Sequence, residues 1–432
     1  MTFQWQLLAI YQSICLLLVT WMEYNSLPHL PKSILLNITY YLNHSDLLNF
    51  RVTCSAFYQT CSSSEVLKRF HIKPRYIIPK FVEFMEKLNG GRHIKLSLQS
   101  LPVQSFCKIF PTLSHVTNIC IKIQDLNNIV KSCKHIHRLK LIDNVLDQCS
   151  SHNEDLHQEY FKCLSDLDRL NEIILKGRNQ VYSAAALAVI IKNAACVEKF
   201  EIDSLTVDNR KKPSLLVKVI SDSSNIKHWS FNDVVFINKK GIMLPTNTLS
   251  FECINTIISP LDGTHTELNK ICIHGIIPYF AKYWRHNDFR NLRYLELQKA
   301  FFYQTKLPVC SRLRTLKLFD CHNSLNYLLN LSPAVERSLR ELVVQAYKNY
   351  NNEGIIALLG KFKNLEHLHL IDMNQIFCAF LCEVKHETLK RITIQNCMKF
   401  YSTQTKCQLN DMKKNLTFQV KLLECHRNVC FV

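Results

Sequence analysis

A short apolar phrase that returns along most of the chain constrains the fold more than any other sequence feature. It reads apolar, two other residues, apolar, one other residue, apolar, and eleven full copies lie between residues 116 and 394. Partial copies lie at residues 96–98 and 249–251. Since successive side chains of a strand point to opposite faces, the last three residues of each copy predict a strand with one buried face.

The spacing of the copies predicts how these strands are joined. Their middle apolar residues follow one another at intervals of 20–29 residues, apart from one interval of 34 between Leu139 and Ile173. Segments between copies, such as residues 126–133, have apolar residues at helical spacing and are predicted to pack behind the strands. One strand–helix unit cannot bury its own apolar face, so the units must stack.

This phrase and period resemble leucine-rich repeats, in which units of about 20–29 residues stack side by side. Three residues past the last strand apolar, that family usually has Asn or Cys, as at Cys321 and Cys397, whereas Val234 and Ala300 depart from it. The resemblance implies an α/β fold. It would be a curved leucine-rich-repeat solenoid of about 13 repeats, with parallel strands on the concave face and helices on the convex face.

Composition argues against several classes of function. The chain has 8 glycines among 432 residues, and only Gly90 and Gly91 are adjacent. No GxxxxGK[ST], GxGxxG or GxSxG motif occurs, which excludes most nucleotide-binding and hydrolase functions. The 19 cysteines form no CxxC pair, so we expect buried free thiols in a reducing compartment. No catalytic residue, metal ligand or cofactor site is predicted.

Ahead of the repeats, residues 30–57 combine short helical stripes with more apolar surface than they can bury alone. Pro31 suits a first helical turn, and Ile34, Ile38 and Leu42 recur at helical spacing after it. Ser45 is a predicted N-cap of the next helix. A module of roughly 40 residues cannot cover this much apolar surface internally, so we expect it to need a partner.

The same segment resembles an F-box, because LPxxILxxIxxYLxxxDLLxxRxxCxxF is matched from Leu30 to Phe57 with its spacing intact. Ser33 stands where that family commonly has Glu. F-box modules followed by leucine-rich repeats are substrate receptors of SCF-type ubiquitin ligases, in which a Skp-type adaptor joins the receptor to a cullin and its RING subunit. The resemblance implies a non-catalytic receptor in the ubiquitin conjugation pathway of protein degradation, cytoplasmic or nuclear.

The resemblance also assigns the adaptor contact to apolar residues of the segment. Some of them must hold the module itself together, so we expect only part of the set to touch the adaptor. The set is Leu30, Pro31, Ile34, Leu35, Ile38, Leu42, Leu47 and Val52.

The repeats are expected to hold a protein substrate, whose identity the sequence does not give. Residues that alternate with the buried apolar ones face the concave surface, which solenoids commonly use for binding. Their mixed charge and the absence of a sustained aromatic run make nucleic acid an unlikely partner. The candidate substrate-binding residues are Arg138, Lys140, Lys176, Glu201, Tyr294, Glu296, Lys317, His369 and Arg391.

Four regions are predicted along the chain: an apolar N-terminal segment at 1–26, an F-box at 27–72, a linker at 73–92 and repeats at 93–432. Residues 5–22 are apolar, but Gln6, Gln12 and Ser13 interrupt them, so they make a poor membrane span. A helix or a mis-started gene model is the preferred explanation, and a membrane anchor stays open.

Two alternatives remain. A membrane-anchored or secreted leucine-rich-repeat binding protein would use residues 5–22 as anchor and would be glycosylated at Asn37, Asn43, Asn330 or Asn415. The net charge of +18 is unevenly placed, because residues 282–318 have nine Lys or Arg against two acidic residues. An acidic or phosphorylated ligand, RNA or a solvated outer surface would each be compatible with such a charge.

Overall fold

The structure is a computed structural model of the 432-residue chain. It describes residues 33, 35–36, 39, 59–60, 71–72, 95–97, 118–142, 161–208, 210, 213–236, 244–256, 267–277, 289–300, 310–345, 350–373, 380–397 and 418–423. The chain divides into two compact units. The first comprises residues 1–120 and 131–136, and the second comprises residues 121–130 and 137–432.

The first unit contains the start of the repeats. Strand β1 (His71–Ile72) pairs in parallel with β2 (Lys95–Ser97), and β2 pairs in parallel with the start of β3 (Asn118–Lys122). Both β2 and β3 fall on predicted copies of the apolar phrase. The residues of the F-box-like resemblance that the structure describes are Ser33, Leu35, Leu36 and Thr39, all helical.

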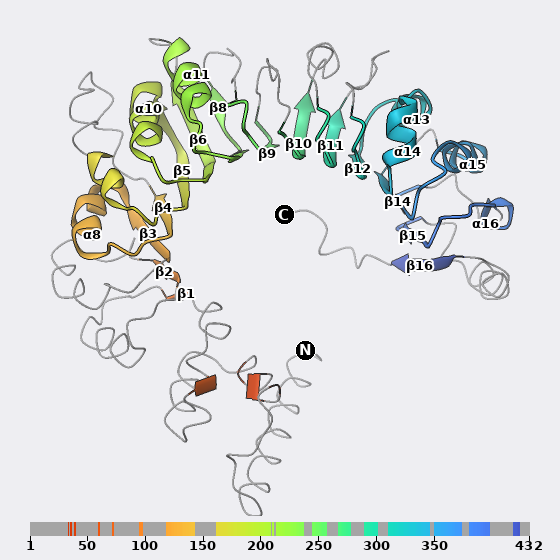
Figure 1. The fold of residues 1–432 in the computed structure, drawn as a ribbon, viewed down its shortest axis with the longest axis horizontal. Helices are drawn as coiled ribbons and strands as arrows, with labels where there is room; N and C mark the ends of the chain where they lie inside the picture. The colour runs from red at the N-terminus through yellow and green to blue at the C-terminus, as the bar shows by residue number, and fades with distance from the viewer. Residues whose placement is uncertain are drawn as a thin grey trace, which may run out of the picture. The chain divides into compact units, whose positions relative to one another are not determined.

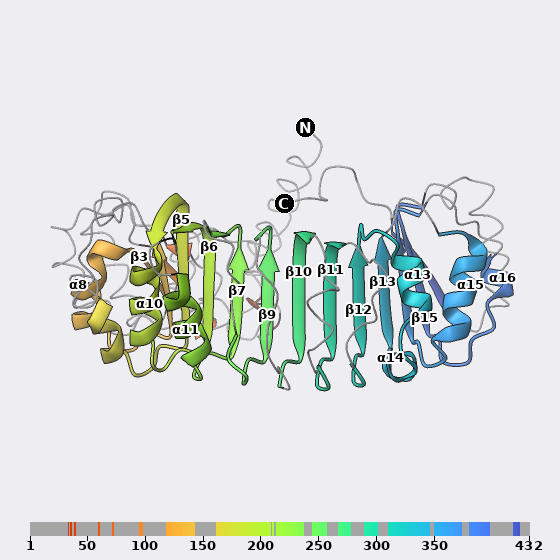
Figure 2. The same cartoon turned by 90° about the horizontal axis from the view of Figure 1, so that it is seen from above.

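The second unit is built on one parallel sheet, whose strands lie side by side in Figure 2. Each strand pairs with the next along the chain, except that β8 pairs with β6 and β7 pairs with β9. The strands are β4 (Arg138–Ile142), β5 (Glu172–Ser183), β6 (Lys199–Asp208), β7 (His228–Asn232), β8 (Val235–Phe236), β9 (Ser250–Ile254), β10 (Lys270–Ile277), β11 (Tyr294–Ala300), β12 (Thr315–Phe319), β13 (Glu341–Gln345), β14 (His367–Ile371), β15 (Arg391–Gln395) and β16 (Gln419–Leu423).

The apolar phrase explains both the strands and their register. Leu295 of β11 lies beside Leu316 of β12, and Leu297 lies beside Leu318, so equal phrase positions are neighbours. All four side chains are fully buried. The same register holds from β4 to β16, and every full predicted phrase in the second unit coincides with a strand. The partial copy at 249–251 is displaced by two residues, because Phe251 rather than Leu249 lies beside Trp229 and Ile271. The predicted leucine-rich-repeat-like solenoid is therefore confirmed.

Backbone hydrogen bonds at the strand starts tie each repeat to the next. The carbonyl of Arg293, just before β11, accepts the N–H groups of Arg314 at 2.9 Å and Thr315 at 3.0 Å. The carbonyl of Arg314 in turn accepts those of Arg340 at 2.8 Å and Glu341 at 2.9 Å. This paired acceptance repeats from the strand start before β4 to the one before β14, so the register is locked before each strand begins.

Helices pack behind the sheet of the second unit, on the outer side of the arch that its strands form in Figure 1. The predicted helix at 126–133 is observed as α8. Ser183 caps α10 by accepting from the Ala186 N–H at 3.1 Å, and Asn351 caps α15 by accepting from Gly354 at 2.9 Å. The helices are α8 (Leu126–Ser132), α10 (Ala184–Asn193), α11 (Pro213–Asp222), α13 (Ser324–Leu329), α14 (Pro333–Ser338), α15 (Asn352–Lys361) and α16 (Phe380–Glu383), with 3₁₀ turns η4 (Ile123–Asp125) and η6 (Lys162–Asp166).

After three of the strands, the side chain at the position named in the repeat resemblance is buried and hydrogen-bonds to the preceding repeat. Cys321 and Cys397 are buried, and their thiols donate to the carbonyls of Leu297 and Leu370 one repeat earlier. Thr256 takes the same role after β9, because its hydroxyl donates to the Phe231 carbonyl at 3.2 Å and accepts from the Val234 N–H at 2.9 Å. The predicted buried thiols are also found, because Cys133, Cys253, Cys272, Cys321 and Cys397 are free and buried.

Large aromatic side chains fill the core where β6, β7 and β9 meet. The Trp229 ring lies parallel to Phe231, with ring centroids 6.0 Å apart, and 5.6 Å from the Phe200 ring. Phe251 of β9 lies 6.1 Å from Phe231. All four side chains are buried, so this part of the core depends on stacked rings rather than on leucine alone.

Asp125, in η4, is a buried carboxylate, and we expect it to make stability depend on pH. It is 1% exposed, and neither carboxylate oxygen has a hydrogen-bond partner among the described residues. Burial raises its pKa from 3.8 to about 6, against the opposing effect of Lys122. Between these values the folded state binds more protons than the unfolded state, so the unfolding free energy falls as pH rises through this window.

The test is the melting temperature of Asp125→Asn between pH 4 and 7.5. At pH 7.5 the variant is expected to be more stable by up to about 3 kcal/mol, the equivalent of a shift of roughly two pKa units, and the gain is expected to vanish near pH 4. Asp168→Asn, at an exposed position, is the matched control, and it is expected to leave the melting temperature unchanged both at pH 4 and at pH 7.5. An equal shift at both pH values would contradict the assignment to ionisation.

Candidate functional site

The face of the second unit's sheet opposite the buried leucines carries the candidate substrate-binding residues. We call it the polar face and define it as the strand residues of β4 to β16 that alternate with the two buried apolar rows. It carries eight Lys or Arg and six Asp or Glu, so it holds little of the chain's charge of +18. The charged residues are Arg138, Lys140, Glu172, Lys176, Lys199, Glu201, Asp203, Glu252, Lys270, Glu296, Lys317, Glu341, Arg391 and Lys421.

On β4 to β6, the predicted residues Arg138 and Lys176 each form an ion pair with a carboxylate on the next strand. Glu172 of β5 accepts from Arg138 at 2.8 Å on one side and from Lys199 at 2.7 Å on the other. Lys176 pairs with Asp203 at 2.6 Å. Burial would raise the pKa of Asp203, but hydrogen bonds from Lys176 and Ser204 hold it below its usual value. These cations already have carboxylate partners within the chain.

Two further predicted residues lie beside this network. Lys140 and Glu201 are half-buried on β4 and β6, with β5 between them. Burial raises the pKa of Glu201, with Lys199 as the largest opposing influence and Glu172 and Asp203 adding to the rise. The network is thus a crowded set of alternating charges rather than an open site.

A different arrangement occurs on β10 to β12, where Tyr294, Glu296 and Lys317 come together. Both carboxylate oxygens of Glu296 are engaged, because Oε1 lies 2.7 Å from the His274 Nε2 and Oε2 accepts from the Tyr294 hydroxyl. The ammonium groups of Lys317 and Lys270 lie over the Tyr294 ring, 5.2 Å and 5.5 Å from its centroid. We call these five residues the Tyr294 cluster.

Ionisation in the Tyr294 cluster follows from these contacts. Burial would raise the pKa of Glu296, but the hydrogen bonds from His274 and Tyr294 hold it below its usual value. The pKa of the Tyr294 hydroxyl is raised, first by burial and then by its bond to Glu296. The cluster therefore holds an ionised Glu296, a neutral phenol and two lysines at neutral pH.

The last two predicted residues lie on β14 and β15, with β13 between them and the Tyr294 cluster. The His369 ring nitrogen Nε2 lies 3.0 Å from the Gln395 amide oxygen, and burial lowers the pKa of His369. Arg391 is exposed at the start of β15. The nine candidates thus fall into three groups, and only the central group places a tyrosine ring beside a lysine that has no carboxylate partner among the described residues.

Sequence reasoning missed Lys270 and His274, which complete the Tyr294 cluster. A signal for them was present, because both stand on the face that alternates with Ile271 and Ile273 in the phrase of β10. Their proximity to Tyr294 and Glu296 depends on register, which places Lys270 beside Tyr294 and His274 beside Gln298.

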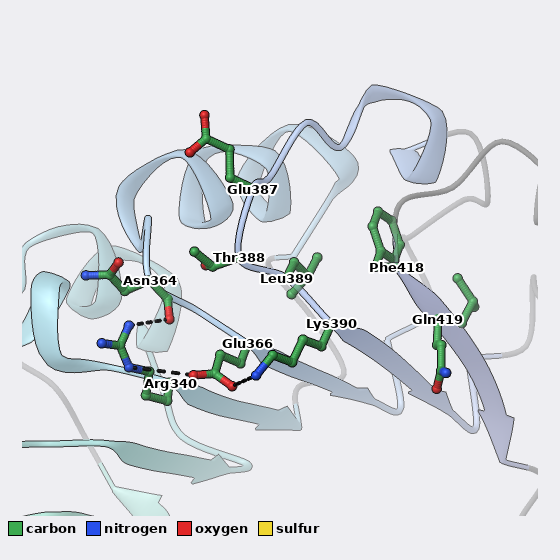
Figure 3. Close-up of a pocket in the computed structure, with 10 residues that line it drawn as sticks. Arg340, Asn364, Glu366, Glu387, Thr388, Leu389, Lys390, Phe418 and Gln419 are labelled. Atoms are coloured by element: carbon green, nitrogen blue, oxygen red, sulfur yellow. Dashed lines mark hydrogen bonds and ion pairs between the residues drawn. The ribbon is translucent and has the colours of Figure 1, made fainter.

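A groove of about 1120 Å³ lies at the starts of β13 to β16, and none of the nine candidates lines it. Figure 3 shows Glu366 between Arg340 and Lys390, with ion pairs of 3.8 Å and 2.5 Å. Leu389 and Phe418 line its apolar part. These ion pairs join Arg340, Glu366 and Lys390 to one another, and Glu387 is a further charged side chain of the lining. Both described cations of the groove therefore have a carboxylate partner.

Most of the predicted adaptor contact lies outside the described residues. Only Leu35 of that set is described, and it is 3% exposed within the chain. The contact therefore stays a prediction. Within the described ranges, no group of three His, Cys, Asp or Glu side chains could hold a metal ion, and no helix is long and apolar enough to cross a membrane.

Comparison with known proteins identifies the type of segment that lies at residues 27–73. Residues 27–73 match the family model described as F-box-like. The chain carries an F-box-like segment. The match encloses the resemblance seen at residues 30–57 and precedes the predicted copies of the apolar phrase. A comparison with curated proteins gives no match.

Three solved structures resemble the chain at low sequence identity. The Rad7 and Elc1 complex of yeast gives 13% identity over 96% of this chain and 94% of that chain, with a TM-score of 0.34. An internalin of Listeria monocytogenes gives 12% identity over 78% and 77%, with a TM-score of 0.28. The TLR13–ssRNA13 complex gives 10% identity over 83% and 65%, with a TM-score of 0.33. We derive no function from these weak similarities.

Proposed function

We propose that this chain is the substrate receptor of an SCF-type ubiquitin ligase. The observation that carries the proposal is the F-box-like segment at residues 27–73 followed by a solenoid of stacked parallel strands. The segment would bind a Skp-type adaptor and, through it, a cullin and its RING subunit. The solenoid would hold the protein substrate on its polar face.

In this role the chain performs no chemistry itself. Binding a substrate on one unit and the adaptor on the other raises the effective concentration of a substrate lysine near the charged conjugating enzyme. The polar face suits recognition, because its paired charges on β4 to β6 are held in place before a substrate arrives.

We propose a cytoplasmic or nuclear location on the basis of cysteine chemistry. Cys133 and Cys253 are free and buried, and burial raises the pKa of both thiols to about 12. Such thiols are inert and need no oxidising compartment. This pattern supports a reducing environment rather than secretion.

The experiment is affinity purification of the tagged full chain from cells, followed by mass spectrometry. We expect the Skp-type adaptor, a cullin and a RING subunit together with substrate candidates. A proteasome or cullin inhibitor is expected to enrich the substrates without changing adaptor recovery. Recovery of the intact chain without any adaptor would contradict the proposal, and a mass shift on deglycosylation would favour the secreted alternative.

A further inference from the structure

Two lysines of the Tyr294 cluster differ from the three ion-paired cations of the polar face. Among the described residues, neither Lys270 nor Lys317 forms an ion pair with a carboxylate, whereas Arg138, Lys176 and Lys199 each have a carboxylate oxygen within 2.8 Å. Both lysine ammonium groups instead lie over one tyrosine ring. Two like charges beside one ring repel each other, and the ring offsets only part of that repulsion.

The ionised carboxylate of Glu296 acts on the charge of Lys317, but among the described residues it forms no ion pair with either lysine. Glu296 stands directly beside Lys317 in the register, but its two oxygens are engaged by His274 and by the Tyr294 hydroxyl. These bonds fix the glutamate and, through the phenol, the tyrosine ring under the ammonium groups. The arrangement is therefore held in place before any ligand binds, which lowers the entropic cost of binding one.

The surroundings define what such a ligand can be. Glu252 lies on β9 and Glu341 on β13, so a carboxylate borders the cluster on each side. Glu341 accepts a hydrogen bond from Thr315 at 3.2 Å, which keeps it on this face. A nucleic acid, with a phosphate on every nucleotide, would meet these carboxylates, whereas a peptide with one acidic side chain between neutral or basic residues would not.

We propose that Lys270, Tyr294 and Lys317 form an anion site that takes a single Asp or Glu side chain from an extended segment of the protein substrate. The ligand carboxylate lies between the two ammonium groups, and the Tyr294 ring packs against the neighbouring part of the peptide. This inference rests on the proposed function, since it names the class of segment that the receptor selects.

The test needs no known substrate. A random 12-residue phage-displayed peptide library is selected on the full chain co-expressed with its Skp-type adaptor, and enriched peptides are labelled for fluorescence anisotropy. We expect enrichment of one Asp or Glu flanked by neutral or basic residues. The double variant K270Q/K317Q is expected to bind the selected peptides about tenfold more weakly or worse, as for charged pairs at an interface centre.

Two further variants distinguish loss of this anion site from a general loss of positive charge and from misfolding. R340Q/K390Q removes the same charge from two residues outside the polar face, both paired with Glu366, and it is expected to leave affinity within about twofold. E296Q removes a negative charge beside the lysines and is expected to bind the peptides several-fold more tightly, an outcome that misfolding cannot produce.

The outcomes are distinct. Selection without acidic enrichment, equal loss in both double variants, or weaker binding by E296Q would overturn the anion site. Binding only by phosphoserine peptides, or by single-stranded RNA with the same dependence on Lys270 and Lys317, would overturn the carboxylate assignment. Adaptor co-purification is measured on the same preparations, so failure of the peptide site with adaptor retained leaves the proposed function standing, and loss of adaptor from the wild type rejects that function separately.

Discussion

Leu47→Asp is expected to remove the Skp-type adaptor from the purified chain. Leu47 belongs to the apolar pattern of the F-box-like segment and lies outside the described residues, so this prediction rests on the sequence match at 27–73. A carboxylate placed in an apolar protein contact would be buried without a partner. A loss of about 3 kcal/mol, or about 100-fold in affinity, is typical for such a position.

The measurement is adaptor recovery in co-purification, with a binding constant from surface plasmon resonance where recovery is partial. Leu47→Met is the matched control, because it conserves volume and apolar character and is expected to keep recovery near that of the wild type. The thermal transition of the solenoid is expected to be the same in both variants. Full adaptor recovery with Leu47→Asp would remove the support for an adaptor contact in this segment.

Trp229→Ala is expected to destabilise the solenoid by about 3–5 kcal/mol, as for other buried tryptophans cut to alanine. Trp229 is 1% exposed and packs on Phe200 and Phe231, so alanine would leave a cavity between three strands. Because repeats stabilise mainly their nearest neighbours, the largest loss of hydrogen-exchange protection is expected in β6, β7 and β9.

Trp229→Phe separates the contribution of the ring from that of the indole nitrogen. The Nε1 atom of Trp229 is buried and has no hydrogen-bond partner among the described residues. Phenylalanine removes this unpaired donor and keeps an aromatic ring, so the expected cost is below about 1.5 kcal/mol. The urea midpoints of both variants measure the difference, and equal midpoints would show that the stacked rings do not hold this part of the core.

The fold could be predicted from the sequence because one short pattern determines it. Each copy of the phrase carries its own strand, and equal positions of successive copies become neighbours, as Leu295 and Leu316 do. What escaped prediction was local. Strand β8, only two residues long, has no phrase of its own. Thr256 takes the place of the family's Asn or Cys, since a hydroxyl can donate to a carbonyl as well as a thiol can.

The sequence predicted which face of the sheet carries the candidate residues, but it did not predict which of them form ion pairs. Alternation placed Tyr294, Glu296 and Lys317 on one face, and the structure brings these three together. The alternation in the sequence does not show which charges form ion pairs, because ion pairing depends on how far each side chain reaches across the neighbouring strands. Arg138 and Lys176 therefore looked equivalent to Lys317 in the sequence, although each has its own carboxylate in the structure.

The paired acceptance of N–H groups at the strand starts decides where this chain can change in length. A residue gained or lost inside a phrase would shift a carbonyl such as that of Arg293 away from both of its donors and turn the buried face outward. A residue gained between phrases disturbs neither bond, and loop closure costs little more as a loop grows. Insertions and deletions are thus confined to the connections, which is where intervals as different as 20 and 34 residues occur.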